Sequence, residues 1–288
     1  MQLIAVLLAV ASALAFATAT VGQQRAAAAS SDADARHGRF IGQLVRNRLW
    51  VAATLGNGAG YALQAAALGV GSVVLVQPIL VTALLFALPL SARLARRRLP
   101  NAVVGWALLL TTSLVVFEIV GKTDKGVAHG AYRDWLIITA VGVPLVAGCL
   151  ISAHGRSGAV RASLLAIAVG VLGGVLAVLT KSVVDTGADS VSDLLSTGET
   201  YALIVVGLGG FYVQQLSFQA GALEASLPIM TVLEPMIAAA LGVTLLHEQL
   251  RADAPWMIAV AAAAMAMTAA TIALARTHAR ASAPPSRT

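Results

Sequence analysis

The chain has 288 residues, of which 58% are apolar and 11% are charged, with 19 basic and 13 acidic side chains. Soluble domains carry about 25% charged residues, so this composition excludes a soluble globular fold. It also excludes disorder, because disordered chains have low hydrophobicity. The net charge of +6 does not indicate a nucleic-acid partner, since the basic residues lie in short segments between apolar runs.

Nine apolar segments follow one another along the chain, each close to the roughly 20 residues that a helix needs to cross a bilayer. None alternates apolar and polar residues as the strand of a membrane barrel does. The sequence therefore predicts an all-α, polytopic membrane bundle of about nine transmembrane helices. The predicted spans are Leu3–Gly22, Leu49–Gly69, Ser72–Ala92, Ala102–Val120, Asp134–Ser152, Arg161–Lys181, Tyr201–Gly221, Ala225–Leu246 and Pro255–Ala275.

The first span has the position of a signal peptide but not its charge pattern. A signal peptide begins with a positive region, whereas Met1-Gln2-Leu3 carries no basic side chain and Arg25 follows the apolar run. We therefore expect the first span to be retained as a membrane helix.

The segment Arg36–Arg48 reads RHGRFIGQLVRNR and is too short and too charged to be a span. Its apolar side chains share one helical face, and most of its arginines lie off that face. One interpretation is a short helix that lies on a leaflet of anionic lipid. The other is a solvated segment leading into the second span. Arg93–Arg98 is the second place where we expect contact with anionic headgroups. The apolar face consists of Phe40, Ile41, Leu44 and Val45.

Basic residues are divided unequally between the two sides of the predicted bundle. Fourteen of the 19 Lys and Arg residues lie in the loops after spans 1, 3, 5 and 7 or in the tail, and five lie on the other side. Cytoplasmic loops carry an excess of basic residues, so we expect a protein of the cytoplasmic membrane with its N-terminus outside and its C-terminus in the cytoplasm. Residues 277–288 are polar and end in Ala-Pro-Pro-Ser-Arg-Thr, which predicts a disordered cytoplasmic tail.

Two stretches of the chain share a pattern. Gln64-Ala-Ala-Ala-Leu precedes Pro78, and Gln219-Ala-Gly-Ala-Leu precedes Pro235, with each proline inside the following span. Spans 1–4 thus correspond to spans 6–9. Five spans, an odd number, separate equivalent positions, so the halves are inverted relative to each other, an arrangement typical of secondary transporters. The alternative is chance similarity among Ala- and Leu-rich helices.

This pattern divides the chain into three parts. Residues 1–152 form the first membrane repeat with the linking fifth span, residues 153–276 form the second membrane repeat, and residues 277–288 form the tail.

Glu234 is the acidic residue that falls deepest inside a predicted span. A charged group at the bilayer centre costs at least about 2.5 kcal/mol on insertion scales and is a functional-site candidate by default. Pro235 directly follows it, and a proline inside a helix removes one backbone donor and disturbs the preceding turn. We predict that Glu234 binds substrate at a helix break made by Pro235, with Pro78 as its counterpart. The alternative is a protonated carboxyl that hydrogen-bonds between helices.

Amide side chains extend this candidate substrate site. Gln77 takes the place of Glu234 in the first repeat, and Gln64, Gln219 and Asn57 add amides at membrane depth. Their alternative role is hydrogen bonding between helices, which contributes about 0.6 kcal/mol on average.

For two further amides, Gln214 and Gln215, we prefer the interhelical role. We predict no cofactor and no catalytic residues, because the chain lacks the P-loop, HExxH and nucleophile-elbow motifs. A metal site remains open at this point. Three glycine-rich stretches, which begin at Gly56, Gly170 and Gly207, predict close approach of helices.

The stretch Leu233-Glu234-Pro235, with AAALGVTLLHEQLRAD after it, resembles the second repeat of the drug/metabolite transporter superfamily, EamA type. The turn of the first repeat, Ser91-Ala92-Arg93-Leu94, departs from that pattern because it lacks an acidic residue. Nine spans with an outside N-terminus are similar in layout to the NIPA-type magnesium transporter branch. The stretch QAAALGVGSVVLVQPILVTALLFALPL is similar to the same branch.

The resemblance implies a transporter, not an enzyme, which moves a small metabolite or a cation across the cytoplasmic membrane by alternating access. The alternative function is a non-transport scaffold subunit of an envelope or lipid-handling complex, bound through Arg36–Arg48 and Arg93–Arg98. A homodimer is a further expectation.

Overall fold

A computed structural model describes residues 2–29, 40–70, 76, 79–96, 99–120, 123–124, 132–189, 197–221, 223–245, 249–250 and 254–281. Within these residues the chain is helical apart from short turns and one pair of two-residue strands, so the prediction of an all-α bundle is confirmed. The elements are α1 (Gln2–Ala28), α3 (Phe40–Arg46), α4 (Arg48–Val70), α6 (Ala83–Leu94), α7 (Asn101–Val120), β1 (Thr123–Asp124), α8 (Tyr132–Ala153), α9 (Gly158–Asp189), α11 (Gly198–Ala220), α12 (Leu223–Leu245), β2 (Gln249–Leu250) and α13 (Ala254–Ala281).

Five of the described helices are long and apolar enough to cross a membrane by length and composition. This indicates a membrane-embedded protein. The helix α4 has 23 residues but does not reach the same apolar level, since it carries Asn57, Tyr61 and Gln64. The five apolar stretches are Gln2–Ala28, Gly158–Val183, Gly198–Ala220, Leu223–Leu245 and Met257–Leu274.

Several helix boundaries differ from the sequence-based expectation, and α1, for example, continues to Ala28. The helix α9 covers Gly158–Asp189 and extends past both ends of the predicted span. The helix α13 continues to Ala281, so the prediction of disorder is wrong for residues 277–281. These residues, THARA, carry no helix breaker and extend an Ala-rich helix, and Ala has the highest helix propensity. The remaining tail lies outside the described residues.

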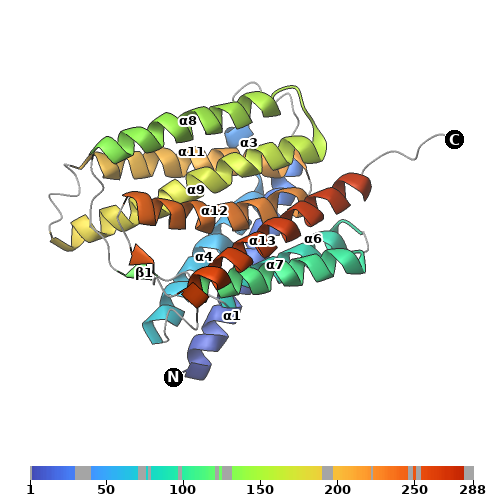
Figure 1. Ribbon diagram of the computed structural model, residues 1–288. Coiled ribbons are helices and arrows are strands. Elements are labelled where there is room, and N and C mark those ends of the chain that lie inside the picture. Colours follow the sequence, from blue (N-terminus) through green and yellow to red (C-terminus); the bar gives the residue numbers. More distant parts are fainter. Residues whose placement is uncertain are drawn as a thin grey trace.

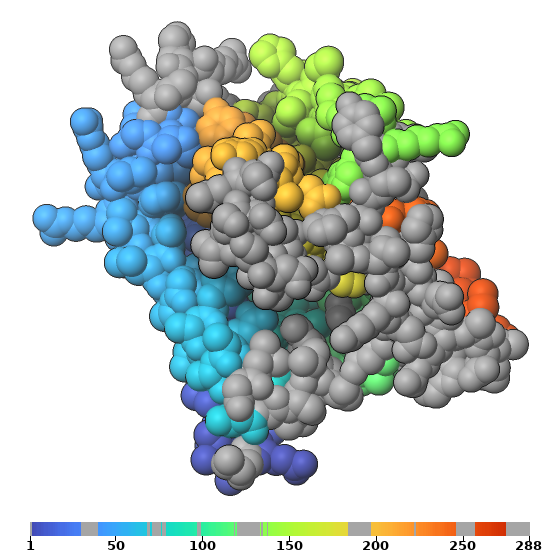
Figure 2. Space-filling model, turned by 90° about the vertical axis from the view of Figure 1, so that its left-hand side faces the viewer, coloured from blue at the N-terminus to red at the C-terminus, as the bar shows by residue number. Residues whose placement is uncertain are grey.

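The helices run side by side in one general direction, with β1 near one end of the bundle and the turn between α8 and α9 at the other (Figure 1). The helix α1 packs against α4 and α6, α9 packs against α11 and α12, and α7 packs against α13. At the first end, β1 and β2 pair in antiparallel fashion. Figure 2 shows this end, where the first turns of α11 (gold) lie between α4 (blue to cyan) and α8 (green).

Glycine residues permit the closest contacts between helices, as predicted. A Cβ atom added to Gly60 would lie 2.8 Å from the ring of Phe16, which brings α4 close to α1. A Cβ atom added to Gly174 would lie 2.5 Å from Cβ of Ile237, which brings α9 close to α12. Gly58 and Gly209 have no such contact within 4 Å among the described residues, so the prediction is wrong for these two.

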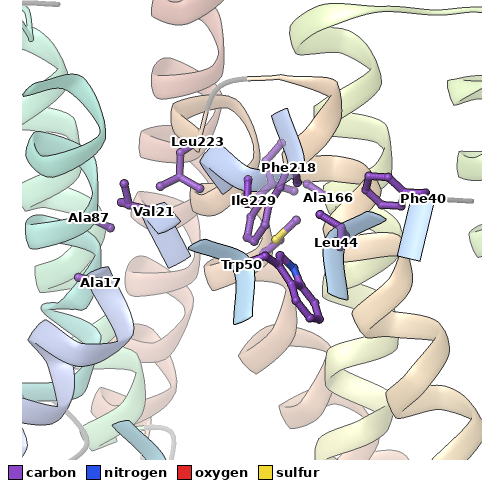
Figure 3. Close-up of a cluster of buried hydrophobic side chains, with 13 residues drawn as sticks. Ala17, Val21, Phe40, Leu44, Trp50, Ala87, Ala166, Phe218, Leu223 and Ile229 are labelled. Atoms are coloured by element: carbon purple, nitrogen blue, oxygen red, sulfur yellow. The ribbon is translucent and has the colours of Figure 1, made fainter. Parts of the chain in front are cut away.

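The short helix α3 packs against the bundle through part of its apolar face. Phe40 and Leu44 are fully buried and belong to a core cluster with Trp50 and Phe218, and Figure 3 shows these side chains gathered around the same centre. Val45 is 54% exposed. Ile41 is partly buried and packs against the same cluster. Three of the four apolar side chains proposed to face lipid therefore contact protein, because the neighbouring helices offer them an aromatic surface.

Candidate functional site

Glu234 lies at the middle of α12, and its side chain is exposed in the protein structure. It emerges beside Gly173 of α9. A Cβ atom added to Gly173 would lie 3.2 Å from both Cγ and Cδ of Glu234. Because Gly173 has no side chain, there is room for the Glu234 side chain to pass between α9 and α12.

Pro235 does not break α12, which is continuous from Leu223 to Leu245. The predicted helix break is therefore wrong. A proline inside a helix removes one backbone donor, here the one that would reach the Thr231 carbonyl, and membrane helices tolerate this loss. The helix therefore stays regular at Pro235, but the Thr231 carbonyl, about one turn before Glu234, lacks its backbone donor.

Tyr61 of α4 has an electrostatic interaction with Glu234 of α12. The ring of Tyr61 is 62% exposed and packs edge-on against Phe16 of α1, with ring centroids 4.9 Å apart. A residue of the second half of the chain thus influences a tyrosine of the first half.

The polar side chains of α4 form one stripe, which we call the α4 stripe. Its members, spaced by three or four residues, fall on one face of a helix, and they include two of the predicted site residues. The stripe explains why α4 is less apolar than the other spans. It consists of Trp50, Thr54, Asn57, Tyr61 and Gln64.

One end of the α4 stripe enters a buried chain of hydrogen bonds. The Nε1 of Trp50 donates to Oε1 of Gln215 at 2.9 Å. The Nε2 of Gln215 donates to Oε1 of Gln23 at 3.4 Å, and Nε2 of Gln23 donates to Oγ1 of Thr54 at 3.3 Å. Gln215 is 0% exposed. Its predicted interhelical role is therefore confirmed, and it links α11 to α1 and α4.

The predicted amide residues do not form one site. Asn57 and Gln64 lie half-buried on the α4 stripe, the face that carries Tyr61. Gln219 instead lines a separate cavity at the end of the bundle opposite β1, together with Glu224 of α12. Gln77 and Pro78 fall outside the described residues. Within the described part of the chain, no group of three or more His, Cys, Asp or Glu side chains could hold a metal ion.

A second polar contact ties three helices together near the β1 end. Trp135 of α8 donates through Nε1 to Oε1 of Glu199 at 3.1 Å, and Ser182 of α9 donates to the other oxygen of the same carboxylate. Glu199 lies in the first turn of α11. Because its partners come from the neighbouring helices α8 and α9, this carboxylate joins α11 to both of them.

Sequence reasoning missed Tyr61 and Gln23. Tyr61 lies inside an apolar run, and Gln23 stands next to Gln24 at the end of another, so neither residue stands out by itself. The signal that could have found Tyr61 is its spacing from Asn57 and Gln64, which are four residues before and three residues after it.

The chain is 37% identical over 279 residues to an uncharacterized protein of Corynebacterium glutamicum, Cgl0250/cg0304, and the match covers 96% of each chain. No model of a known protein family matches the chain. No solved structure matches it either.

Proposed function

The chain belongs to the family of the C. glutamicum protein Cgl0250/cg0304, and we propose that it is a secondary transporter of the drug/metabolite transporter type with Glu234 in its substrate site. The observation that carries this proposal is the exposed carboxyl of Glu234 at the middle of α12, a helix long and apolar enough to cross a membrane. A carboxyl at this depth is costly and usually marks a substrate or ion pathway.

The α4 stripe supports a polar path through the membrane. It runs from the buried chain around Gln215, past Tyr61, to Gln64 near the β1 end of α4. A helix that faces only lipid and apolar neighbours gains nothing from such a stripe. A helix that lines a path for a polar solute needs one.

The packing pattern supports an inverted repeat. The helix α1 packs against α4 and α6, and its proposed counterpart α9 packs against α11 and α12 in the same way. The proposed counterparts α7 and α13 pack against each other, as expected for two helices on either side of a two-fold axis.

The direction of the helices supports the inversion. One cavity is lined by Ser91 and Ala95 at the C-terminal end of α6 and by Glu224 at the N-terminal end of α12. These equivalent helices therefore run in opposite directions, which is the arrangement that supports alternating access in secondary transporters. By the excess of basic residues, this end of the bundle faces the cytoplasm.

The test is solute flux into liposomes that contain the purified protein. The probes are L-alanine as a small metabolite, and Mg²⁺ and ethidium as an inorganic and an organic cation. We expect flux of at least one probe above that of empty liposomes, and loss of this flux in Glu234→Gln. Tyr61→Phe should also lower this flux, because it removes the hydroxyl that interacts electrostatically with Glu234.

Tyr201→Phe is the matched control, because Tyr201 is 57% exposed in the first turn of α11, away from Glu234. Full transport in Glu234→Gln would contradict the assignment of the site. Absence of flux for all three probes, together with a stoichiometric partner on purification, would favour the scaffold function instead.

A further inference from the structure

A cavity of about 440 Å³ lies at the end of the bundle opposite β1. The ends of α1, α6, α11 and α12 form its walls, so both halves of the chain contribute to it. Its volume falls within the range of roughly 300–1,000 Å³ that small-molecule sites occupy. Its polar lining consists of Gln24, Arg25, Ser91, Gln219 and Glu224.

Glu224 lines this cavity and has one carboxylate oxygen without a hydrogen-bond donor among the described residues. Its Oε2 is buried and accepts no hydrogen bond from any described residue. Glu224 lies in the first turn of α12. A buried acceptor without a donor is costly. An ammonium group in the cavity would form a charge-assisted pair with this carboxylate.

Arg25 supplies the opposite charge. It lies in the last turn of α1, is exposed, and lines the same cavity. Among the described residues, no ion pair joins Arg25 to Glu224. A guanidinium group binds a carboxylate or a phosphate through parallel hydrogen bonds. The cavity is therefore lined by one basic and one acidic side chain that form no ion pair with each other.

Neutral groups complete the lining between the two charges. The Nε2 of Gln24 donates to the Gly221 carbonyl at 3.2 Å, which fixes this amide at the wall between α1 and α11. Ser91 is 9% exposed and brings a hydroxyl from α6. These groups add hydrogen-bonding capacity and no net charge.

We infer that this cavity binds a small zwitterion, with its ammonium group at Glu224 and its anionic group at Arg25. The site is separate from Glu234, which lies ten residues further along α12, or about 15 Å at the rise of a helix. The inference does not depend on transport. Two sources share this chemistry, namely an amino-acid-like metabolite and the headgroup of an ethanolamine lipid.

The test is isothermal titration calorimetry on the purified full-length protein in detergent. The zwitterionic probes are L-alanine, β-alanine, 4-aminobutyrate and glycerophosphoethanolamine. Ethylamine and propionate each carry one of the two charges. We expect at least one zwitterion to bind more tightly than ethylamine and propionate. A preference for glycerophosphoethanolamine assigns the site to a lipid headgroup, and a preference for an amino acid assigns it to a free metabolite.

Two variants locate the binding. Glu224→Gln and Arg25→Gln should each weaken the zwitterion about tenfold or more, because each removes a charge-assisted contact. Arg156→Gln is the matched control, since Arg156 is exposed in the turn between α8 and α9 and does not line the cavity. Circular dichroism and the melting temperature establish that each variant is folded.

Three outcomes would overturn the inference. The first is that no zwitterion binds to the wild type. The second is that both cavity variants bind the zwitterion as tightly as the wild type does. The third is that ethylamine binds as tightly as the best zwitterion. Because equilibrium binding requires no flux, failure here leaves the transport proposal standing. If binding to the cavity is found but no flux is found, the transport proposal fails and the inference about the cavity stands.

Discussion

Hydrogen-bonded glutamines stabilise the contact between the two halves of the chain at the level of single residues. Gln215 accepts from Trp50 and donates to Gln23, and all three side chains are buried. A buried acceptor that loses its donor costs about 1–3 kcal/mol, whereas replacing both partners by apolar groups is nearly neutral. Single and double substitutions in this set of hydrogen bonds should therefore differ in their effect on the free energy of unfolding.

Trp50→Phe leaves the buried Gln215 Oε1 without its donor, so it should lower the free energy of unfolding by about 1–3 kcal/mol. The double variant Trp50→Phe with Gln215→Leu should lose less than the sum of the two single variants. Unfolding in mixed detergent, followed by circular dichroism, measures both. Trp106→Phe removes an indole of α7 with no hydrogen bond among the described residues and controls for ring size. Additive effects in the double variant would contradict the role given to this bond.

Single residues also show what can be predicted from sequence. Glu234 stands out because a charge interrupts an apolar run. Gln64 and Gln219 look equivalent in the repeat, and each lies near the C-terminal end of its helix. Under the proposed inversion such positions lie toward opposite ends of the bundle. This accounts for Gln219 lining the end cavity while Gln64 lies on the α4 stripe, a separation that local sequence does not reveal.

At the level of helices, glycines in α9 determine how closely α12 approaches. Gly170, Gly173 and Gly174 all face α12, where Leu233, Glu234 and Ile237 fill the space. The helices themselves could be predicted, because the length and apolar composition of these segments are sufficient to indicate a helix. Continuity through Pro235 could not be predicted, since it depends on neighbouring helices that support the turn.

Gly174→Ala should destabilise the bundle, because the new Cβ would lie 2.5 Å from Cβ of Ile237 and 3.0 Å from the Ala238 nitrogen. Gly209→Ala makes the same change in α11 with nothing within 4 Å among the described residues. Both variants gain the same helix propensity, about 1 kcal/mol in a soluble helix, so propensity cancels in the comparison. The melting temperature in detergent should fall for Gly174→Ala and hold or rise for Gly209→Ala. Equal shifts would contradict close packing of α9 on α12.

At the level of the whole molecule, the orientation proposed from the basic residues can be tested with single cysteines. Arg133 is exposed in the first turn of α8, and Arg156 is exposed in the turn that follows α8. The helix between them has 22 residues and is about 33 Å long at the rise of a helix. In a Cys149→Ser background, a membrane-impermeant maleimide should label Arg133→Cys in intact cells. Arg156→Cys should react only after permeabilisation. The reverse pattern would contradict the orientation, and labelling of both from one side would contradict the topology.

The central claim is that the exposed Glu234 faces water in a path between the two halves and does not face lipid. The direct measurement is the reaction of Glu234→Cys, in the Cys149→Ser background, with a charged methanethiosulfonate reagent in membrane vesicles. Leu208→Cys is the reference, because Leu208 is 68% exposed on the apolar α11, and thiols react as thiolates, which require water. The proposal predicts that position 234 reacts and position 208 does not. Equal protection of both positions would place Glu234 against lipid and contradict the transport site.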